Sequence, residues 1–186
     1  MKRTVRKEPR HLIRSTLLVV GEGADDRAFI NHLKQLYCPR ESGMSVKIEA
    51  GDGGSPGNVI AHAIRKYQGK DYDRRLFLLD ADLPPNEAES KRAAKAGYAI
   101  ILWQPQCLEG ALLDALGETV APHESSQQLK NRLHPRLDGR HTDARAYASL
   151  FTRQELDKAR NAAVTQVRDV LIARPVVGLE KRHRDH

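Results

Sequence analysis

Residues 16–26, TLLVVGEGADD, decide the fold of this chain. Its first five residues are almost all apolar and are followed by Gly21, a pattern typical of a strand buried in a parallel sheet. Asp25 and Asp26 then open a segment, residues 25–37, whose apolar side chains recur at helical spacing. Acids in the first turn complement the helix dipole, so this segment is predicted to be an amphipathic helix. The stretch therefore predicts a strand that leads directly into a helix.

The same alternation repeats along the chain. Further strands are predicted at residues 44–50, 75–79 and 98–103, and further helices at residues 58–68, 86–96 and 107–116. Strands that alternate with helices over short connections are typical of a parallel sheet with helices on its faces. We therefore expect an α/β fold, with a Rossmann-like parallel sheet flanked by helices.

Past Gly117 this alternation stops. The following stretch is rich in charged residues, His and Pro, with a short helix predicted at 125–133 and a long helix at 153–173. We expect residues 15–117 to form the sheet domain and residues 118–186 to form a C-terminal helical appendage packed on it.

The net charge of +7 is concentrated before the first strand. Residues 1–14 form a basic arm in which six basic residues stand against one acid, Glu8. Such an arm either contacts phosphates through a salt-sensitive, sequence-independent attraction or is a solvated tail.

Composition limits the class of protein. The chain has 186 residues, of which 40% are hydrophobic and 30% charged, so wholesale disorder is excluded. No apolar run approaches the roughly 18 residues of a membrane span, and no signal-peptide apolar segment follows the basic start. Cys38 and Cys107 lie far apart, which argues against a disulfide framework and a cysteine-based zinc site. We expect a cytoplasmic protein without a membrane partner.

Carboxylates follow three of the four predicted strands. Glu22 and Asp26 come after the first strand, Asp80 and Asp82 after the third, and Glu109 after the fourth. Ligands of parallel α/β sheets bind at the carboxyl ends of the strands, so these acids should meet at one edge. They would repel one another unless cations lie between them, and oxygen ligands suit Mg²⁺ or Mn²⁺. Two such ions would clamp an in-line phosphodiester displacement.

Several of these acids also have structural interpretations. Asp25 is favoured as a helix-capping acid. Asp80 and Asp82 have turn chemistry as their alternative, and Glu109 has a place in the first turn of a helix.

Two other features have structural and functional interpretations. GDGGSPG at residues 51–57 is favoured as a tight strand-to-helix turn over a phosphate loop, because it lacks the Lys-Ser/Thr ending. His134, His141 and Asp143 lie in the irregular stretch, where they either face the site as ligands or acids or, as we favour for the histidines, lie on the surface.

Two motifs carry a resemblance to a known family. LLVVGEGADD at residues 17–26 and LFLLDAD at residues 76–82 together resemble the Toprim domain, whose mark is Glu-Gly after the first strand and Asp-x-Asp after the third. The resemblance covers the sheet domain, residues 15–117. Within this family the chain is most similar to the RloB-like and OLD-type nucleases of phage defence.

The resemblance implies a role for each acid. Asp80, Asp82 and Asp26 would hold metal, with Asp26 matching an acid four residues after the family glutamate. Glu22 would be the general acid or base, or a further ligand. Glu109, in the segment QPQCLEG, would complete a second metal position. The catalytic residues implied are Glu22, Asp80 and Asp82, and the implied cofactor is Mg²⁺ or Mn²⁺.

The function implied is that of a divalent-metal-dependent endonuclease acting on nucleic acid in phage defence. A topoisomerase needs a breakage domain with a nucleophilic tyrosine, and a primase needs further nucleic-acid modules, for which the chain has no room. Two alternatives remain. One is a latent or non-catalytic partner subunit, switched on by an ATPase or sensor subunit, and the other is an RNA-processing Toprim ribonuclease. The nuclease branch often uses a lysine that has no clear match here, and Arg136, Arg140 and Arg145 are its candidate substitutes.

Overall fold

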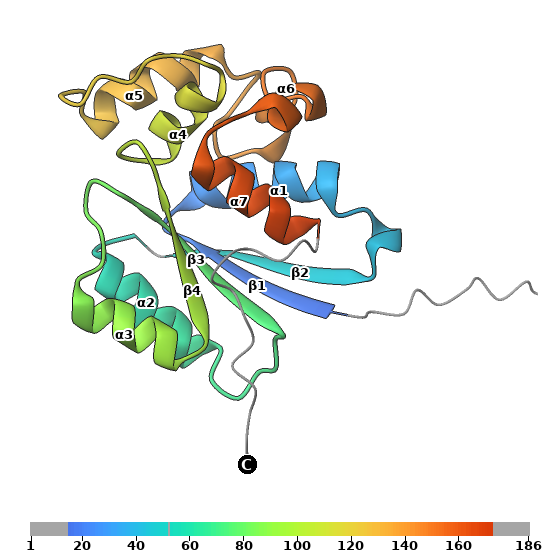
Figure 1. Cartoon of the computed structure of the whole chain (residues 1–186), viewed down its shortest axis with the longest axis vertical. Coiled ribbons are helices and arrows are strands. Elements are labelled where there is room, and N and C mark those ends of the chain that lie inside the picture. Colours follow the sequence, from blue (N-terminus) through green and yellow to red (C-terminus); the bar gives the residue numbers. More distant parts are fainter. Residues whose placement is uncertain (1–14, 52, 173–186) are drawn as a thin grey trace, which may run out of the picture.

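The computed structural model describes residues 15–51 and 53–172. Its elements in chain order are β1 (Ser15–Gly21), α1 (Ala24–Tyr37), β2 (Met44–Ala50), α2 (Pro56–Lys66), β3 (Arg74–Asp80), α3 (Glu87–Lys95), β4 (Tyr98–Trp103), α4 (Leu108–Ala115), α5 (Ser126–Leu133), α6 (Arg153–Lys158) and α7 (Ala162–Leu171). The expected α/β fold with a Rossmann-like parallel sheet is confirmed (Figure 1). The predicted basic arm, residues 1–14, and the end of the predicted appendage, residues 173–186, lie outside the described residues.

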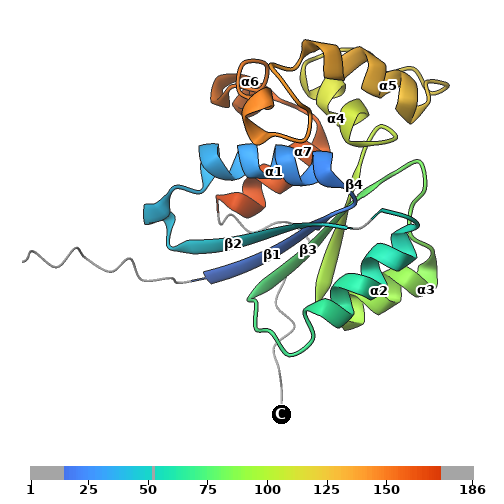
Figure 2. The ribbon, with the colours of Figure 1, turned by 180° about the vertical axis from the view of Figure 1, so that it is seen from behind.

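The sheet has the strand order β2-β1-β3-β4, and all neighbouring strands are parallel. Helices α1 and α7 cover one face, and α2 and α3 cover the other (Figures 1 and 2). The chain leaves β1 toward one edge of the sheet and returns through α2 to place β3 on the other side of β1. This reversal is a topological switch point, where open α/β sheets bind their ligands.

The apolar run of β1 is buried because it faces both helical layers. Leu17 and Val19 pack in the core under α1 and α7, while Leu18 and Val20 pack in the core with α2 and α3. Successive strand residues point to opposite faces, so a strand covered on both faces must be apolar at consecutive positions. The continuous apolar sequence of β1 therefore matches its place in the middle of the sheet, where helices cover both of its faces.

The predicted long helix at 153–173 is wrong, because the structure divides it into α6 and α7. Asn161 lies at the break and caps α7, with its side-chain oxygen accepting a hydrogen bond from the Val164 N–H (3.1 Å). Its amide nitrogen donates to the Gln104 carbonyl (2.7 Å) and to Asp114 Oδ2 (2.8 Å). These contacts stabilise a new helix start at Asn161, and a continuous helix would not form them. Residue 173 itself is not described.

The C-terminal helices share the core of the sheet domain. Phe29 of α1 packs against Trp103 at the end of β4 and against Tyr147 and Phe151, with ring centroids between 5.5 and 6.2 Å apart. Helix α7 contributes Val164 to the same core. Within residues 15–51 and 53–172, no helix combines the length and apolar character needed to cross a membrane.

Candidate metal centre

Two of the predicted site residues meet at the topological switch point. Glu22 follows β1 and Asp80 ends β3, and the two strands are neighbours in the sheet. The Glu22 carboxylate accepts a hydrogen bond from the Asp80 backbone N–H, with 3.1 Å between Oε2 and nitrogen. Asp80 Oδ1 in turn accepts from the Leu108 N–H at the start of α4 (3.2 Å). Both carboxylates are therefore held at the carboxyl edge of the sheet.

Asp82 is exposed and lies beside this pair. Its backbone N–H donates to the Gln106 carbonyl (2.8 Å), and its carboxylate accepts a hydrogen bond from the Ser126 hydroxyl of α5. The pKa of Glu22 is raised above its ordinary value, first by burial and then by the negative charge of Asp82, against a lowering hydrogen bond from Asp80. Glu22 thus contacts Asp80 and lies close enough to Asp82 for the charge of Asp82 to act on it, but within residues 15–51 and 53–172 these three carboxylates are not a group whose ligand atoms all lie within 4.8 Å of one another.

Asp26 is more deeply buried than Glu22, Asp80 and Asp82, and its side chain holds parts of the fold together. Its side chain is buried, Oδ2 accepts from the Gly23 N–H (2.8 Å), and Oδ1 accepts from the Trp103 indole N–H (2.6 Å). Burial raises the pKa of Asp26 to about 7, although both hydrogen bonds lower it. A Cβ on Gly21 would overlap Asp26, so only glycine at this position lets α1 start so close to β1. Asp26 therefore joins the start of α1 to the end of β4, a contact that the sequence analysis did not predict.

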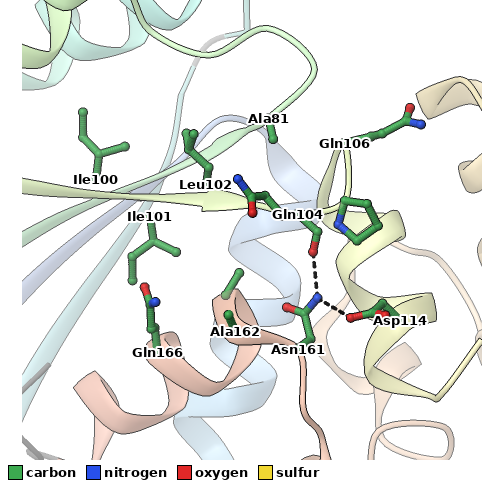
Figure 3. A pocket seen from close by; sticks show the side chains of 12 residues that line it. Ala81, Ile100, Ile101, Leu102, Gln104, Gln106, Asp114, Asn161, Ala162 and Gln166 are labelled. Atoms are coloured by element: carbon green, nitrogen blue, oxygen red, sulfur yellow. Dashed lines mark hydrogen bonds between the residues drawn. The ribbon is translucent and has the colours of Figure 1, made fainter. Parts of the chain in front are cut away.

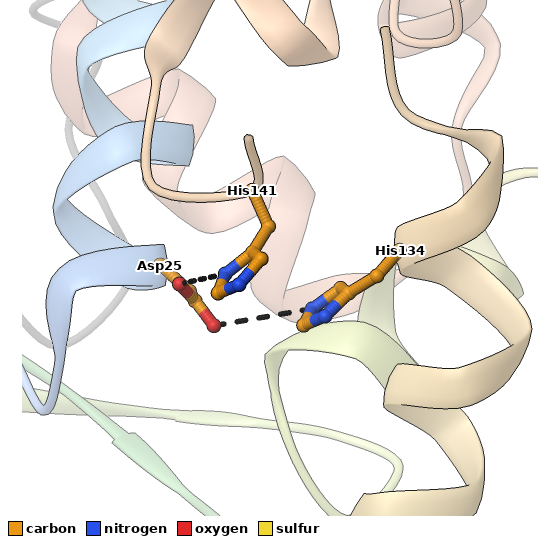
Figure 4. A group of neighbouring side chains, drawn as sticks. All are labelled: Asp25, His134 and His141. Carbon is orange, nitrogen blue, oxygen red and sulfur yellow. Dashed lines mark hydrogen bonds and ion pairs between the residues drawn. The ribbon is translucent and has the colours of Figure 1, made fainter. Parts of the chain in front are cut away.

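Glu109 in the first turn of α4 connects the acids to two histidines. Its side chain is almost fully buried, and Oε1 accepts a hydrogen bond from Nε2 of His134 (2.9 Å). His134 Nε2 is also 3.9 Å from Asp25 Oδ2, and His141 Nδ1 is 2.6 Å from Asp25 Oδ1 (Figure 4). The two imidazoles stack, with ring centroids 4.2 Å apart and planes inclined by 5°.

This arrangement corrects the preferred interpretation of three residues. Asp25 does lie in the first turn of α1, but its carboxylate pairs with both histidines. His134 and His141 face the acids rather than lying as isolated surface side chains. Asp143, by contrast, accepts from the Arg145 N–H (2.9 Å) and caps a short turn of helix at Ala144–Tyr147.

A lysine that the sequence analysis missed also faces the acids. The pKa of Lys130 is raised, because the charges of nearby Glu109, Asp25 and Asp80 outweigh the opposing effect of burial, the largest single influence. Of the arginines considered for this role, Arg136 pairs with Glu118 and Arg145 pairs with Asp143.

Lys130 belongs to a row of site-facing residues along α5 and at its C-terminal cap. Ser126, Lys130 and His134 are spaced four residues apart and so lie on one face of a helix. Ser126 contacts Asp82, and His134 contacts Glu109. This spacing, once helix 125–133 was predicted, was the available signal for all three.

The pKa of Asp80 shows the effect of the crowded acids. Burial raises the pKa of Asp80 to about 8, and the charges of Asp26, Glu22 and Glu109 add to this effect. A bound cation offsets the free-energy cost of ionising such a carboxylate. Carboxylate oxygens, the donors of Glu22, Asp80 and Asp82, are the ligand type that hard divalent ions such as Mg²⁺ and Mn²⁺ prefer.

Cys107 is not a nucleophile at this site. Its side chain is fully buried, and burial raises the pKa of the thiol to about 12. The thiolate that nucleophilic chemistry needs is therefore scarce at neutral pH.

A hollow lies beside β4, next to the acids but not among them. Its volume is about 730 Å³, and its lining includes Ile101, Gln104, Gln106 and Gln166 (Figure 3). Asp114, which also lines it, is already bonded to Asn161. Neutral amides and apolar side chains dominate, so this hollow lacks the charge of the site.

Comparison of the chain with protein-family models, curated proteins and solved structures finds no match. No family is shown by these comparisons, and the resemblance to the Toprim domain rests on the sequence motifs.

Proposed function

We propose that this protein is a divalent-metal-dependent nuclease of the Toprim type, which holds Mg²⁺ or Mn²⁺ at Glu22, Asp80 and Asp82. The observation that carries the proposal is the contact between Glu22 and Asp80 across the topological switch point. This contact supports a ligand site at the place where α/β sheets bind their ligands.

The acids suit phosphodiester chemistry because of their arrangement. When bound, a divalent ion would polarise a phosphoryl oxygen and lower the pKa of a coordinated water. Asp26 and Glu109 add negative charge behind the three ligands, as their effects on the pKa of Asp80 show. The surplus of carboxylates over nearby cations among the described residues supports cation binding, and Lys130 is the described cation whose charge lowers the pKa of Glu22.

The chain supplies two further groups. Lys130 offers a positive charge to the non-bridging oxygens of a phosphate held beside the acids. Glu22 is either a further ligand or, because burial raises its pKa, the general acid or base that exchanges a proton with the attacking or leaving oxygen. The setting in phage defence, and activation by an ATPase or sensor subunit, rest on the resemblance alone and form part of the proposal.

Single-turnover cleavage of end-labelled DNA and RNA, single- and double-stranded, tests the proposal. The wild-type protein should cleave at least one substrate in Mg²⁺ or Mn²⁺ and none in EDTA. Glu22→Gln and Asp82→Asn should lower the rate at saturating substrate by at least about 10²-fold, because the ligands act on the transition state. Glu87→Gln, a matched change of an exposed acid on α3, should cleave at the wild-type rate.

Two outcomes would overturn the nuclease proposal. Cleavage by Asp82→Asn at the wild-type rate would place the activity elsewhere. Mg²⁺ binding at Asp82 without cleavage of any substrate would favour the alternative, a non-catalytic partner subunit.

A further inference from the structure

A second cluster of ligating side chains lies beside the acids and has a different composition. Asp25 comes from the first turn of α1, His134 follows α5, and His141 lies in the loop beyond. One ligand atom from each residue lies within 4.8 Å of the other two (Figure 4). Three residues from separate segments thus converge on one point.

We propose that Asp25, His134 and His141 form a binding site for a Zn²⁺-like transition-metal ion. Imidazole nitrogen suits Zn²⁺ and its neighbours in the first transition row, whereas Mg²⁺ prefers oxygen ligands alone. Two histidines and one carboxylate leave coordination positions for water or a substrate oxygen, as in catalytic rather than structural zinc sites. The site is thus chemically distinct from the oxygen-only group at Glu22, Asp80 and Asp82.

The loop that carries His141 is held in place. The Tyr147 hydroxyl donates to the His141 carbonyl (2.8 Å), and the Tyr147 ring is buried against Phe29 and Phe151. The Asp138 N–H donates to the Ala146 carbonyl (3.0 Å), which closes the base of the loop. The imidazole is therefore positioned before any ion arrives, and little conformational freedom is lost on binding.

Charge around the cluster also favours a cation. Asp25 and the buried Glu109 place two carboxylates at the imidazoles, 2.6 Å from His141 and 2.9 Å from His134. Among the described residues, Lys130 is a cation whose pKa is raised by the charges of both acids. A divalent ion at the triad would compensate the remaining negative charge.

The inference does not depend on the proposed function. None of the triad residues belongs to the proposed magnesium ligands, so a zinc site stands or falls whether or not the protein cleaves nucleic acid.

Competition with a chromophoric chelator measures Zn²⁺ affinity, and visible absorption of bound Co²⁺ reports nitrogen ligands. Both use the untagged full-length protein. His141→Ala and Asp25→Asn should each weaken Zn²⁺ binding by more than about tenfold, since loss of even an outer partner costs that much. Both should also remove the intensified Co²⁺ bands. His141 is partly exposed, so its replacement should not unfold the protein.

Three controls separate this site from others. His123→Ala changes an exposed histidine before α5, and the double variant His183→Ala/His186→Ala removes histidines near the C-terminus. Both should bind as the wild type does. Asp82→Asn should also retain Zn²⁺ affinity, and excess Mg²⁺ should not displace the ion. Wild-type affinity in both His141→Ala and Asp25→Asn, or loss of binding in the tail variant, would overturn the proposal.

Discussion

The carboxylate of Glu22 accepts a hydrogen bond from the backbone amide of Asp80, 58 residues further along the chain, at 3.1 Å. The contact exists because β1 and β3 are neighbours although β2 lies between them in sequence. It joins the carboxyl ends of the two central strands, and a third acid, Asp82, is near enough for its charge to raise the pKa of Glu22. The proposed chemistry depends on this alignment.

Asp80→Asn should stabilise the metal-free protein above pH 4. The pKa of Asp80 rises from 3.8 to about 8 on folding, so between these values the folded state binds more protons than the unfolded state. The wild-type free energy of unfolding in EDTA should therefore fall as pH rises from about 4 to 8. Urea denaturation across this range should show a shallower fall for Asp80→Asn. Equal slopes of unfolding free energy against pH in the two proteins would show that ionisation of Asp80 does not destabilise the fold.

Mg²⁺ should raise the melting temperature of the wild type, because an ion that binds only the folded state stabilises it by mass action. Asp82→Asn and Glu22→Gln should lose most of this shift, and Glu87→Gln should keep it. Calorimetric scans at several Mg²⁺ concentrations measure the effect. An equal shift in all four proteins would mean that the ions bind elsewhere.

Trp103→Phe should destabilise the fold by about 1–3 kcal/mol, the usual cost of leaving a buried polar group without its partner. The ring still packs against Phe29, but Asp26 loses the donor at 2.6 Å. The loss of unfolding free energy should be larger at pH 9 than at pH 5, because a hydrogen bond to the ionised Asp26 carboxylate is stronger than one to the protonated acid. Chemical denaturation at both pH values tests this, and an unchanged unfolding free energy would remove the contact from the account.

Lys130→Met should lower the single-turnover cleavage rate by roughly 10²-fold, the scale of losing one stabilising group for transition-state charge. This prediction rests on the proposed function. Affinity for Mg²⁺ should stay the same or increase, since a competing positive charge is gone. Lys91→Met, on the exposed surface of α3, is the matched control. Weaker Mg²⁺ binding in Lys130→Met would contradict the assigned role.

Asn161→Ala should cost about 1–2 kcal/mol, the upper part of the range for losing an N-cap residue. Asn161 caps α7 and also bonds to Gln104 and Asp114, so more than one contact is lost. Thermal unfolding should show a lower melting temperature. A smaller loss in Ser125→Ala, which caps α5 at the surface, would show that the tertiary contacts of Asn161 matter.

Local sequence patterns predicted the sheet because its strands and helices are short and strongly patterned. The apolar runs at 16–20 and 75–79 are buried strands as expected, residues 98–103 form the partly buried edge strand β4, and Ser55 accepts from the Asn58 N–H at the start of α2. The long helix at 153–173 failed for a non-local reason. The partners of Asn161 lie 57 and 47 residues away, and no helical periodicity contains that information.

The residues of the candidate site also fall into two groups, those that local sequence located and those that only tertiary packing brings to the site. Glu22 and Asp80 follow apolar strands, so strand ends located them. Lys130, His134 and His141 come from a region without strands, and only tertiary packing against α1 and α4 brings them to the acids. Their single local signal was the four-residue spacing on α5, which covers two of the three.

A crystal structure of the protein with Mn²⁺, with anomalous scattering to locate the ion, tests the central claim most directly. The account predicts an anomalous peak within about 2.0–2.6 Å of carboxylate oxygens of Glu22, Asp80 and Asp82, a distance range set by oxygen coordination of such ions. The peak should disappear in Asp82→Asn. A structure with Mn²⁺ only at other residues, or with none bound at saturating concentration, would contradict the claim that these acids form a metal centre.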